Sequence, residues 1–211
     1  MAVVFPLAHI AAVVLGCVYL AAVVFEQQTV KYLLKPTVTM LIAYPVDSST
    51  YPGIFYGLVQ SAIGDSFLMV PDERMFVPGL VSFLAAHVCY TASFAARWRA
   101  AWPGVPLAAA ATAMVVQLWP GVEREPGVVQ AGVVAYVCAI VAMAYRAVLG
   151  GNRVLVAGAL LFCVSDALLA WGKFMQAHAW TEPAVMLTYY AAQLCIAGAH
   201  IWPQRSKTER Q

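Results

Sequence analysis

Charged side chains are scarce in this chain of 211 residues. Asp, Glu, Lys and Arg together make up 10% of it, whereas 63% of the residues are hydrophobic. A soluble globular protein typically carries about 25% charged residues, and so few charges cannot cover the surface of a soluble domain of this size. The composition therefore indicates a polytopic membrane protein whose outer surface faces lipid. The net charge of +2 gives no indication of a nucleic-acid partner.

The sequence also lacks several patterns that define functional sites. Its five cysteines lie inside separate apolar runs, which predicts neither a disulfide framework nor a CxxC metal site. No GxSxG, GxGxxG or Walker motif occurs, which argues against serine hydrolase and nucleotide chemistry. The N-terminal stretch 2–25 is apolar without a basic leader region, and it is too long for a signal-peptide core. It fits a first spanning helix.

Long apolar runs, by contrast, follow one another along the whole chain. A helix crosses a bilayer with roughly 17 to 25 mostly apolar residues, and about eight such runs are present. Short turn-like or charged segments separate them, which favours antiparallel neighbours in one bundle. We therefore predict an all-α fold, a polytopic transmembrane bundle, as a single domain over 1–203 with a polar tail at 204–211. The predicted helices are 3–25, 33–48, 53–70, 75–97, 102–119, 127–149, 153–172 and 183–202.

Lysine and arginine orient this bundle, because cytoplasmic loops carry an excess of both. The excess places both termini in the cytoplasm. In that orientation the cytoplasmic side holds Arg97, Arg99, Arg146, Arg153, Arg205, Lys207 and Arg210. The opposite side holds Lys31, Lys35, Arg74, Arg124 and Lys173. Lys35 and Lys173 abut or enter apolar runs, so they are candidate site residues as well as loop charges.

Two aspartates lie well inside predicted spanning helices. Asp65 occurs in GLVQSAIGDSFLMV at 57–70, and Asp166 occurs in GALLFCVSDALLAW at 158–171. An ionisable residue deep in a spanning helix costs at least about 2.5 to 3.5 kcal/mol on insertion scales, and it usually faces the bundle interior with a partner or water. If the two carboxylates approach within a few ångströms, both cannot stay ionised, and one can act as an acid and the other as a base.

Other polar side chains fall at roughly the depth of the two aspartates. With the predicted topology these are Lys35, Tyr189 and Gln193, and Gln193 is expected to bond a carboxylate or a substrate. A purely structural interpretation pairs Asp65 with Lys35 and Asp166 with Lys173. The two interpretations are compatible, because a lysine can hold one aspartate ionised.

One histidine lies within a predicted spanning helix. His87 occurs in SFLAAHVCYTASF, with Tyr90 on its face. Asp65, His87 and Asp166 are a conceivable metal-ligand set, but no HExxH or comparable spacing supports it, and we predict no metal. The other histidines lie near predicted helix ends or in a loop, where solvated or interfacial roles are expected: His9, His178 and His200.

Four stretches together resemble the YhhN-like lysoplasmalogenase family of integral membrane proteins. Their specific elements are the GD pair, FxxxH followed by Y, FxxSDxxLA and YYxAQ, and the match looks closer to animal than to bacterial members. The stretches are KPTVTMLIA at 35–43, GDSFLMVPDERMFVPGLVSFLAAHVCYTASF at 64–94, GALLFCVSDALLAWGKF at 158–174 and TYYAAQLCIAG at 188–198.

The resemblance implies a membrane-embedded hydrolase that cleaves the vinyl ether bond of lysoplasmalogens. The products would be a fatty aldehyde and glycerophosphoethanolamine or glycerophosphocholine. The implied partners are the lysoplasmalogen substrate and membrane lipids, and no cofactor is required. The implied location is the endoplasmic reticulum in an animal cell and the inner membrane in a bacterium. Neither the residues nor the resemblance indicates an oligomeric state.

Vinyl ether hydrolysis matches the two aspartates chemically. The β-carbon is protonated, water adds to the resulting oxocarbenium-like species, and the hemiacetal collapses. An acid and a base are needed, as in glycoside hydrolysis. We expect Asp65 and Asp166 to fill these roles, in an order that the sequence leaves open, and Lys35 to bind phosphate or tune one aspartate. Further candidates for positioning water or substrate are His87, Tyr90, Tyr189 and Gln193.

Three other classes of function remain open at this point. A transporter or channel also places carboxylates inside a bundle, but it predicts an aqueous path and matched inverted halves, and no clear halves are seen. A metal-dependent lipid amidase of the seven-helix type would require a histidine-rich cluster, whereas three of the four histidines are predicted to be peripheral. A purely structural membrane protein would tolerate Asp65→Asn and Asp166→Asn without functional loss.

Overall fold

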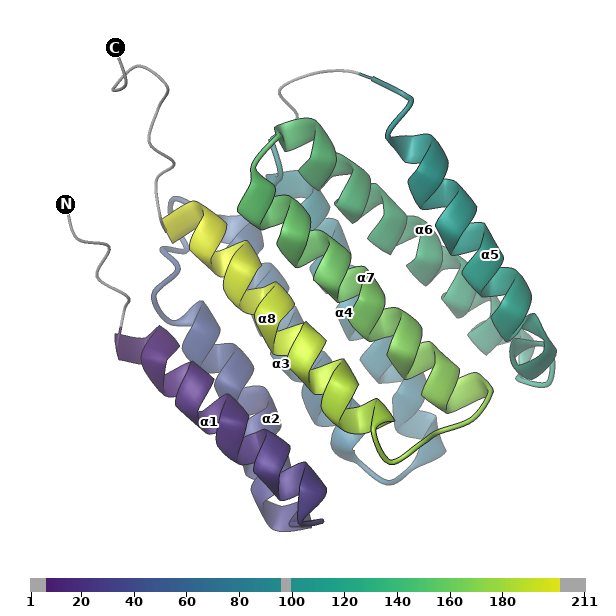
Figure 1. Cartoon of the computed structure of the whole chain (residues 1–211), viewed down its shortest axis with the longest axis horizontal. Coiled ribbons are helices and arrows are strands. Elements are labelled where there is room, and N and C mark those ends of the chain that lie inside the picture. Colours follow the sequence, from purple (N-terminus) through teal and green to yellow (C-terminus); the bar gives the residue numbers. More distant parts are fainter. Residues whose placement is uncertain (1–6, 96–99, 202–211) are drawn as a thin grey trace.

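The structure is a computed structural model that describes residues 7–95 and 100–201. Over these residues the chain forms eight α-helices and one short 3-10 helix, η1, and no strand (Figure 1). The predicted all-α class is therefore confirmed. The predicted tail at 204–211 lies outside the described residues. The elements are α1 (Leu7–Val24), α2 (Gln28–Ala43), α3 (Pro52–Met69), η1 (Glu73–Met75), α4 (Phe76–Ser93), α5 (Gly104–Val122), α6 (Gly127–Gly150), α7 (Arg153–Phe174) and α8 (Thr181–Ile201).

The helices lie side by side, and consecutive helices run in opposite directions (Figure 1). The first residue of α1 and the last of α8 lie at the same end of the bundle. α7 packs along α8, α3 along α4, and α1 along α2, while α6 joins α4, α5 and α7. α8 also contacts α1, α2 and α3, so it closes the N-terminal half against α7.

Five segments are long and apolar enough to cross a membrane by themselves: α1, η1 with α4, α5, α6 and α7. This confirms a polytopic helical membrane protein. In the described part of the chain, the three helices outside this set are α2, α3 and α8. α2 has only 16 residues, and all three contribute buried polar side chains, including Thr39, Asp65 and Gln193. These three helices thus turn polar side chains inward, as α4 does with His87 and α7 with Ser165.

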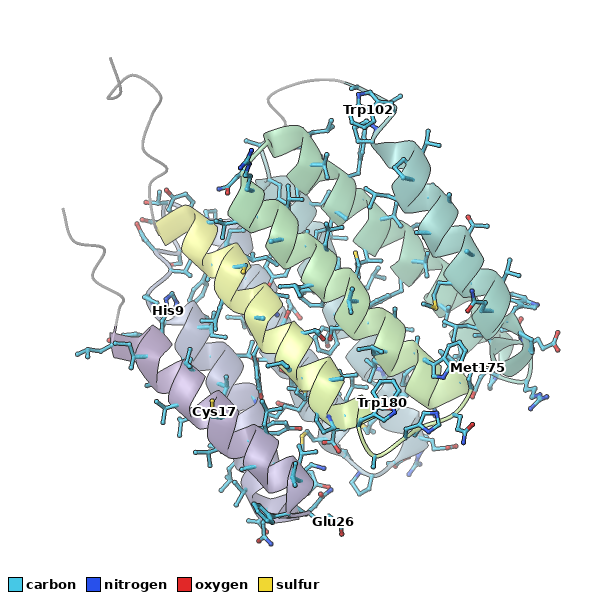
Figure 2. The ribbon with its side chains drawn as sticks, in the orientation of Figure 1. His9, Cys17, Glu26, Trp102, Met175 and Trp180 are labelled. Atoms are coloured by element: carbon cyan, nitrogen blue, oxygen red, sulfur yellow. The ribbon has the colours of Figure 1, made fainter. Side chains whose placement is uncertain are left out.

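The outer surface is apolar, as a lipid environment requires. Large hydrophobic side chains such as Val14, Val88 and Val116 are more than half exposed on α1, α4 and α5. Trp102 and Trp180 lie toward opposite ends of the bundle (Figure 2), and both are largely exposed. Tryptophan is enriched at the two membrane–water interfaces, so these side chains indicate where the hydrocarbon region ends.

Where they fall on described residues, the predicted helix boundaries hold to within three residues except for the second helix. The predicted ends at 3, 97 and 202 lie outside the described residues. The second helix was expected over 33–48, but it begins at Gln28 and ends at Ala43. It ends two residues before Pro45, whose ring disfavours a further helical turn, although Pro36 is accommodated inside the same helix. The fifth helix was expected to stop before Pro120, but it continues to Val122.

The connection between α2 and α3 is organised by Asp47. Its Oδ1 accepts hydrogen bonds from the backbone N–H and the hydroxyl of Ser49 at 2.9 and 2.8 Å, and its Oδ2 accepts one from the hydroxyl of Thr50 at 2.5 Å. These hydrogen bonds, led by that from Thr50, lower the pKa of Asp47 to about 2. The side chain thus holds a tight polar turn between the two helices.

Close packing of α3 against α4 depends on glycine. A Cβ at Gly57 would overlap the ring of Tyr90, and a Cβ at Gly64 would lie 2.6 Å from the ring of Phe83. Both aromatic side chains are buried. Small residues at such positions let spanning helices approach closely, which here brings the α4 aromatic side chains against the segment that carries Asp65.

Gly57→Ala is expected to destabilise the bundle by about 1–3 kcal/mol, because the added methyl group must displace the fully buried Tyr90 ring. Thermal unfolding in detergent micelles measures this loss. The matched control is Gly127→Ala in the first turn of α6, where a Cβ would meet no atom within 4 Å. Equal unfolding temperatures for the two variants would contradict the close-packing argument.

Candidate active site

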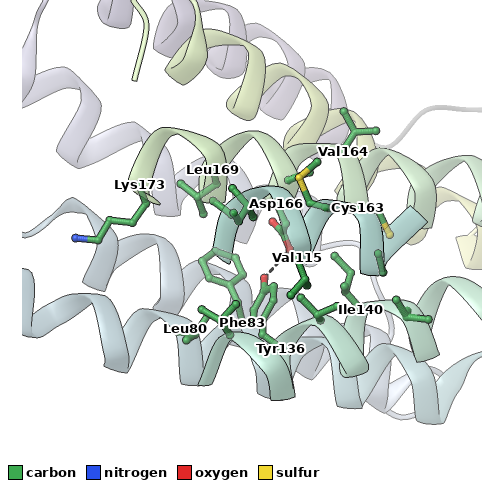
Figure 3. Close-up of a pocket in the computed structure, with 18 of the residues that line it drawn as sticks. Leu80, Phe83, Val115, Tyr136, Ile140, Cys163, Val164, Asp166, Leu169 and Lys173 are labelled. Carbon is green, nitrogen blue, oxygen red and sulfur yellow. Dashed lines mark hydrogen bonds between the residues drawn. The ribbon is translucent and has the colours of Figure 1, made fainter. Parts of the chain in front are cut away.

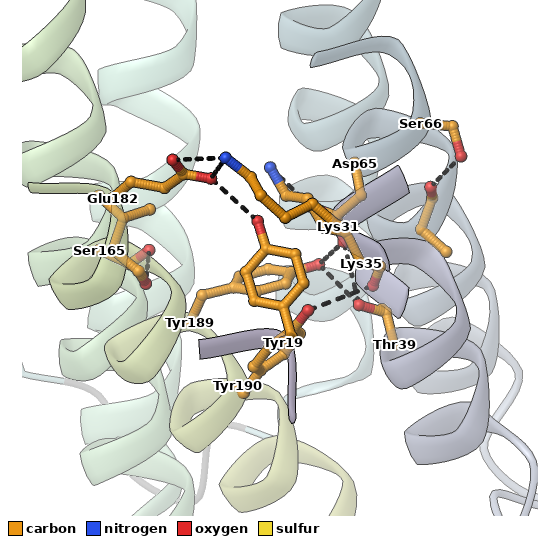
Figure 4. A network of polar contacts seen from close by, with 12 residues as sticks. Tyr19, Lys31, Lys35, Thr39, Asp65, Ser66, Ser165, Glu182, Tyr189 and Tyr190 are labelled. Atoms are coloured by element: carbon orange, nitrogen blue, oxygen red, sulfur yellow. Dashed lines mark hydrogen bonds and ion pairs between the residues drawn. The ribbon is translucent and has the colours of Figure 1, made fainter. Parts of the chain in front are cut away.

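Asp65 lies at the centre of a buried network formed by α2, α3 and α8 (Figure 4). Its Oδ2 accepts hydrogen bonds from the hydroxyls of Thr39, at 3.0 Å, and Tyr189, at 2.8 Å. The Nζ of Lys35 lies 3.7 Å from its Oδ1. The residue is 1% exposed. These donors and the ammonium replace the water that the carboxylate loses on burial.

A second polar cluster lies near Lys35, where α1, α2 and α8 meet (Figure 4). The Nζ of Lys31 is 2.8 Å from Oε1 of Glu182, and the hydroxyl of Tyr19 donates to the same oxygen at 3.2 Å. Glu182 belongs to the first turn of α8, where a carboxylate complements the helix dipole. Its contacts with α1 and α2 add a tertiary role that its position in the sequence did not indicate.

Asp166 lies in α7 in a different setting (Figure 3). Its Oδ2 accepts a hydrogen bond of 2.5 Å from the hydroxyl of Tyr136 on α6. Nε2 of His87, on α4, lies 3.6 Å from the same oxygen. The expected structural pair with Lys173 is wrong, because the Nζ of Lys173 lies 3.8 Å from Glu73 instead. Asp166 and Lys173 are two helical turns apart, whereas helical neighbours are three or four residues apart.

His87 lies beside Asp166, with one ring nitrogen hydrogen-bonded within its own helix and the other turned toward the carboxyl group. Nδ1 of His87 is 2.6 Å from the carbonyl oxygen of Phe83. A carbonyl only accepts, so Nδ1 must carry a hydrogen. A neutral imidazole then turns the lone pair of Nε2 toward the carboxyl group of Asp166. At 3.6 Å this contact is longer than a hydrogen bond, and Nε2 has no hydrogen-bond partner among the described residues.

Asp166 also lines an apolar cavity of about 510 Å³ between α4, α5, α6 and α7. Of the described residues that line the cavity, the charged ones are Asp166 and Lys173. Leu160 and Val164, also on its wall, are 42% and 48% exposed, so the cavity opens toward the lipid-facing surface. Other lining side chains include Leu80, Met114, Val137 and Ile140.

Aromatic side chains connect the surroundings of the two aspartates. The ring of Tyr189, which bonds Asp65, lies 5.6 Å from that of Phe162, and Phe162 lies 4.8 Å from the ring of His87. Within the described part of the chain, the two carboxylates belong to separate hydrogen-bond networks, and Asp166 is the one at the cavity wall.

Tyr90 and Gln193, the remaining predicted site residues, bond each other. The hydroxyl of Tyr90 donates to Oε1 of Gln193 at 2.8 Å, and Ser61 Oγ lies 3.5 Å from the Tyr90 hydroxyl. Both predicted residues are buried. Gln193 was expected to bond a carboxylate or a substrate, but its oxygen accepts from Tyr90. This pair therefore supports the layer next to Asp65 rather than touching either aspartate.

Sequence patterns did not single out Tyr136 or Thr39, which bond the two aspartates. Thr39 lies in the KPTVTMLIA stretch, so the resemblance was its only signal, and Tyr136 had none.

The other histidines lie in α1, in the α7–α8 connection and at the end of α8. His9 was expected to be solvated or interfacial, but it is fully buried, with Nε2 3.2 Å from the carbonyl of Ile42. His178 stacks on Trp180 in the α7–α8 connection, and the side chain of His200 lies outside the described residues. No group of three potential metal ligands was found in the described ranges.

The fold and the site define a polytopic helical membrane protein with buried carboxylates beside a lipid-accessible cavity. The YhhN family model matches residues 28–200, and this range contains every residue of both aspartate networks. The chain belongs to the YhhN family.

Several named relatives are similar over most of this chain. Lysoplasmalogenase TMEM86A of Bos taurus is 35% identical over 176 residues, which are 79% of this chain and 70% of the relative. Lysoplasmalogenase TMEM86B of Homo sapiens is 36% identical over 157 residues, 71% and 64% of the two chains. A lysoplasmalogenase of Mycobacterium tuberculosis is 28% identical over 149 residues, 66% and 56% of the two chains. No solved structure matches this chain.

Lys35→Met is expected to destabilise the protein by about 2–4 kcal/mol, because it leaves the carboxylate of Asp65 buried without its counter-ion. The free energy of unfolding in mixed micelles measures the loss. Combining Lys35→Met with Asp65→Asn should recover at least half of it, since the uncompensated charge is then removed.

Lys31→Met is the matched control for this experiment, because the Glu182 partner of Lys31 is 47% exposed and such a pair contributes less than about 1 kcal/mol. Equal losses for the two lysine variants, or no recovery in the double variant, would show that Lys35 does not compensate Asp65.

Proposed function

We propose that this protein is a lysoplasmalogenase, which hydrolyses the vinyl ether bond of lysoplasmalogens within the membrane. The products are a fatty aldehyde and glycerophosphoethanolamine or glycerophosphocholine. Membership of the YhhN family and the names of relatives that are 35% and 36% identical support the reaction. The observation that carries the proposal is Asp166, a carboxyl group on the wall of an apolar cavity that opens toward the lipid-facing surface. The membrane is that of the endoplasmic reticulum in an animal cell and the inner membrane in a bacterium.

The cavity suits a single-chain lipid. Its volume of about 510 Å³ falls within the usual range of small-molecule sites. Its walls are hydrocarbon apart from a few polar groups, and its opening beside Leu160 and Val164 lets an alkenyl chain enter from the bilayer. A substrate that lies along α7 brings its vinyl ether within reach of Asp166.

Asp166 is the acid of the first step. It transfers its proton to the β-carbon of the alkenyl chain, and the electron pair of the double bond forms the new C–H bond. The adjacent carbon and the ether oxygen then share the positive charge of an oxocarbenium ion. The hydrogen bond from Tyr136 holds the carboxyl group in place during this transfer, with the ring of His87 beside it. The carboxylate that remains stabilises the cation next to it.

Water completes the reaction at the same carboxylate. It adds to the oxocarbenium carbon and gives one proton to Asp166, which restores the acid. The hemiacetal then collapses: its hydroxyl proton passes to the glycerol oxygen, the C–O bond breaks and the aldehyde forms. One carboxyl group thus acts as acid and then as base.

Asp65 acts on this reaction through its charge. It is enclosed by Thr39, Tyr189 and Lys35 and lies in a network next to the cavity wall. Its negative charge balances the ammonium of Lys35, so the cationic intermediate does not form beside an uncompensated lysine. This balance matters because charges are weakly screened among apolar helices. Lys35 keeps that carboxylate in place and offsets the cost of its burial.

Purified wild-type protein is expected to release aldehyde from lysoplasmenylethanolamine in detergent micelles, in the presence or absence of EDTA. Asp166→Asn should lower the rate by at least about 1,000-fold, because it removes the general acid. Asp65→Asn should lower it by about 10- to 100-fold, because it leaves the Lys35 ammonium uncompensated near the cationic intermediate but removes no proton donor.

Asp47→Asn makes the same chemical change in the α2–α3 connection and should leave the rate unchanged. Unfolding temperatures separate inactive from unfolded variants. Absence of aldehyde with wild-type protein would refute the proposed activity, and a wild-type rate in a folded Asp166→Asn variant would refute the mechanism.

A further inference from the structure

The second charged residue on the cavity wall is Lys173, in the last turn of α7 (Figure 3). Its side chain is 28% exposed, and its Nζ lies 5.1 Å from the centre of the Phe76 ring. The ammonium thus lies at the membrane edge of the cavity, over an aromatic face that favours a cation. An ammonium there faces both the aqueous boundary and the apolar interior.

Contacts within the protein give only a weak structural reason for this lysine. Its ion-pair partner, Glu73, is 95% exposed and 3.8 Å away, and such surface pairs contribute little to stability. A cation near a helix C-terminus also complements the helix dipole, but that effect does not require the side chain to line a cavity. A ligand in the cavity would meet an ammonium with little competition from Glu73.

The spacing of Asp166 and Lys173 along α7 is comparable to the distance between the vinyl ether and the phosphate of a lysoplasmalogen. Seven residues along a helix correspond to two turns, or about 10.5 Å along the axis. In the substrate, roughly six bonds of about 1.5 Å lie between the vinyl carbon bonded to the ether oxygen and the phosphorus atom. This path spans at most about 8 Å. In the structure the Lys173 side chain points away from Asp166 (Figure 3). To cover the remainder, its flexible four-carbon stem must turn back along the cavity wall.

We propose that Lys173 binds the phosphate of the lysoplasmalogen and thereby sets the vinyl ether beside Asp166. This inference rests on the proposed function. The headgroup lies at the membrane edge by Lys173, the vinyl ether two turns deeper, and the alkenyl chain extends along the cavity toward Leu160. Lys35, the residue that the sequence suggested for phosphate, is paired with Asp65 and does not line this cavity.

Two substrates test this role: lysoplasmenylethanolamine, and a 1-alkenylglycerol with the same chain but no phosphate. Lys173→Met should raise KM for the phospholipid by roughly 10- to 100-fold, the usual effect of losing a charge-assisted hydrogen bond, with kcat changed less than about threefold. KM for the alkenylglycerol should not change. Lys173→Arg should restore most of the lost affinity, because it keeps the cation.

Glu73→Gln is the matched control, because it breaks the same ion pair and keeps the ammonium. It should leave KM for both substrates unchanged. An equal loss on both substrates in Lys173→Met, or the same loss in Glu73→Gln, would show a structural role and overturn the inference. If Lys35→Met raised KM for the phospholipid alone and Lys173→Met did not, phosphate binding would be assigned to Lys35 and the inference would be overturned. Failure of the proposed function is distinct, since wild-type protein would then release aldehyde from neither substrate.

Discussion

The compensation of Asp65 inside an apolar bundle is the constraint on which the rest of the structure depends. A carboxylate with 1% exposure needs donors from other helices, and it obtains them from α2 and α8. Those two helices and α3 are the ones that fall outside the set of strongly apolar spans. Hydrogen bonds and an ion pair between their polar side chains hold these three helices in the bundle. The helices α1, α4, α5, α6 and α7 supply most of the lipid-compatible surface. The polar contacts around Asp65 therefore determine that α2, α3 and α8 must be neighbours.

That arrangement also separates two environments for the aspartates. Close packing of α3 and α4 at glycines brings Phe83 and Tyr90 against the Asp65 segment, and the rings of Phe162 and Tyr189 complete the layer. Beyond this layer, α5 stands away from the N-terminal helices and leaves the cavity that Asp166 faces. One carboxylate is thus locked in a charge-balanced network, and the other meets a space that admits a ligand. Identical side chains acquire different chemical roles from the packing around them.

The sequence was sufficient to predict the features that depend on the composition of a single helix. Apolar runs predicted the helices, and a carboxylate inside such a run singled out Asp65 and Asp166. The partners depended on which helices pack together, and this is why Tyr136 and Thr39 were missed: hydroxyl residues are common in apolar helices, and only the contacts of α6 with α7 and of α2 with α3 give these two a role. His9 was misjudged for the same reason, since the first turn of α1 is covered by the end of α2. The lysine at position 173 shares a helix face with Asp166 but lies too far along the axis to pair with it.

The side opening of the cavity at Leu160 and Val164 has a consequence for how catalysis would be organised in space. A lipid that enters through it never leaves the bilayer, so the relevant concentration is the mole fraction of substrate in the membrane, not its amount per volume of water. The two products then part: the long-chain aldehyde returns sideways into the hydrocarbon, and the water-soluble glycerophosphodiester departs past the membrane edge. Diluting the membrane with inert lipid would slow such an enzyme even at constant bulk substrate, which is the behaviour called surface dilution.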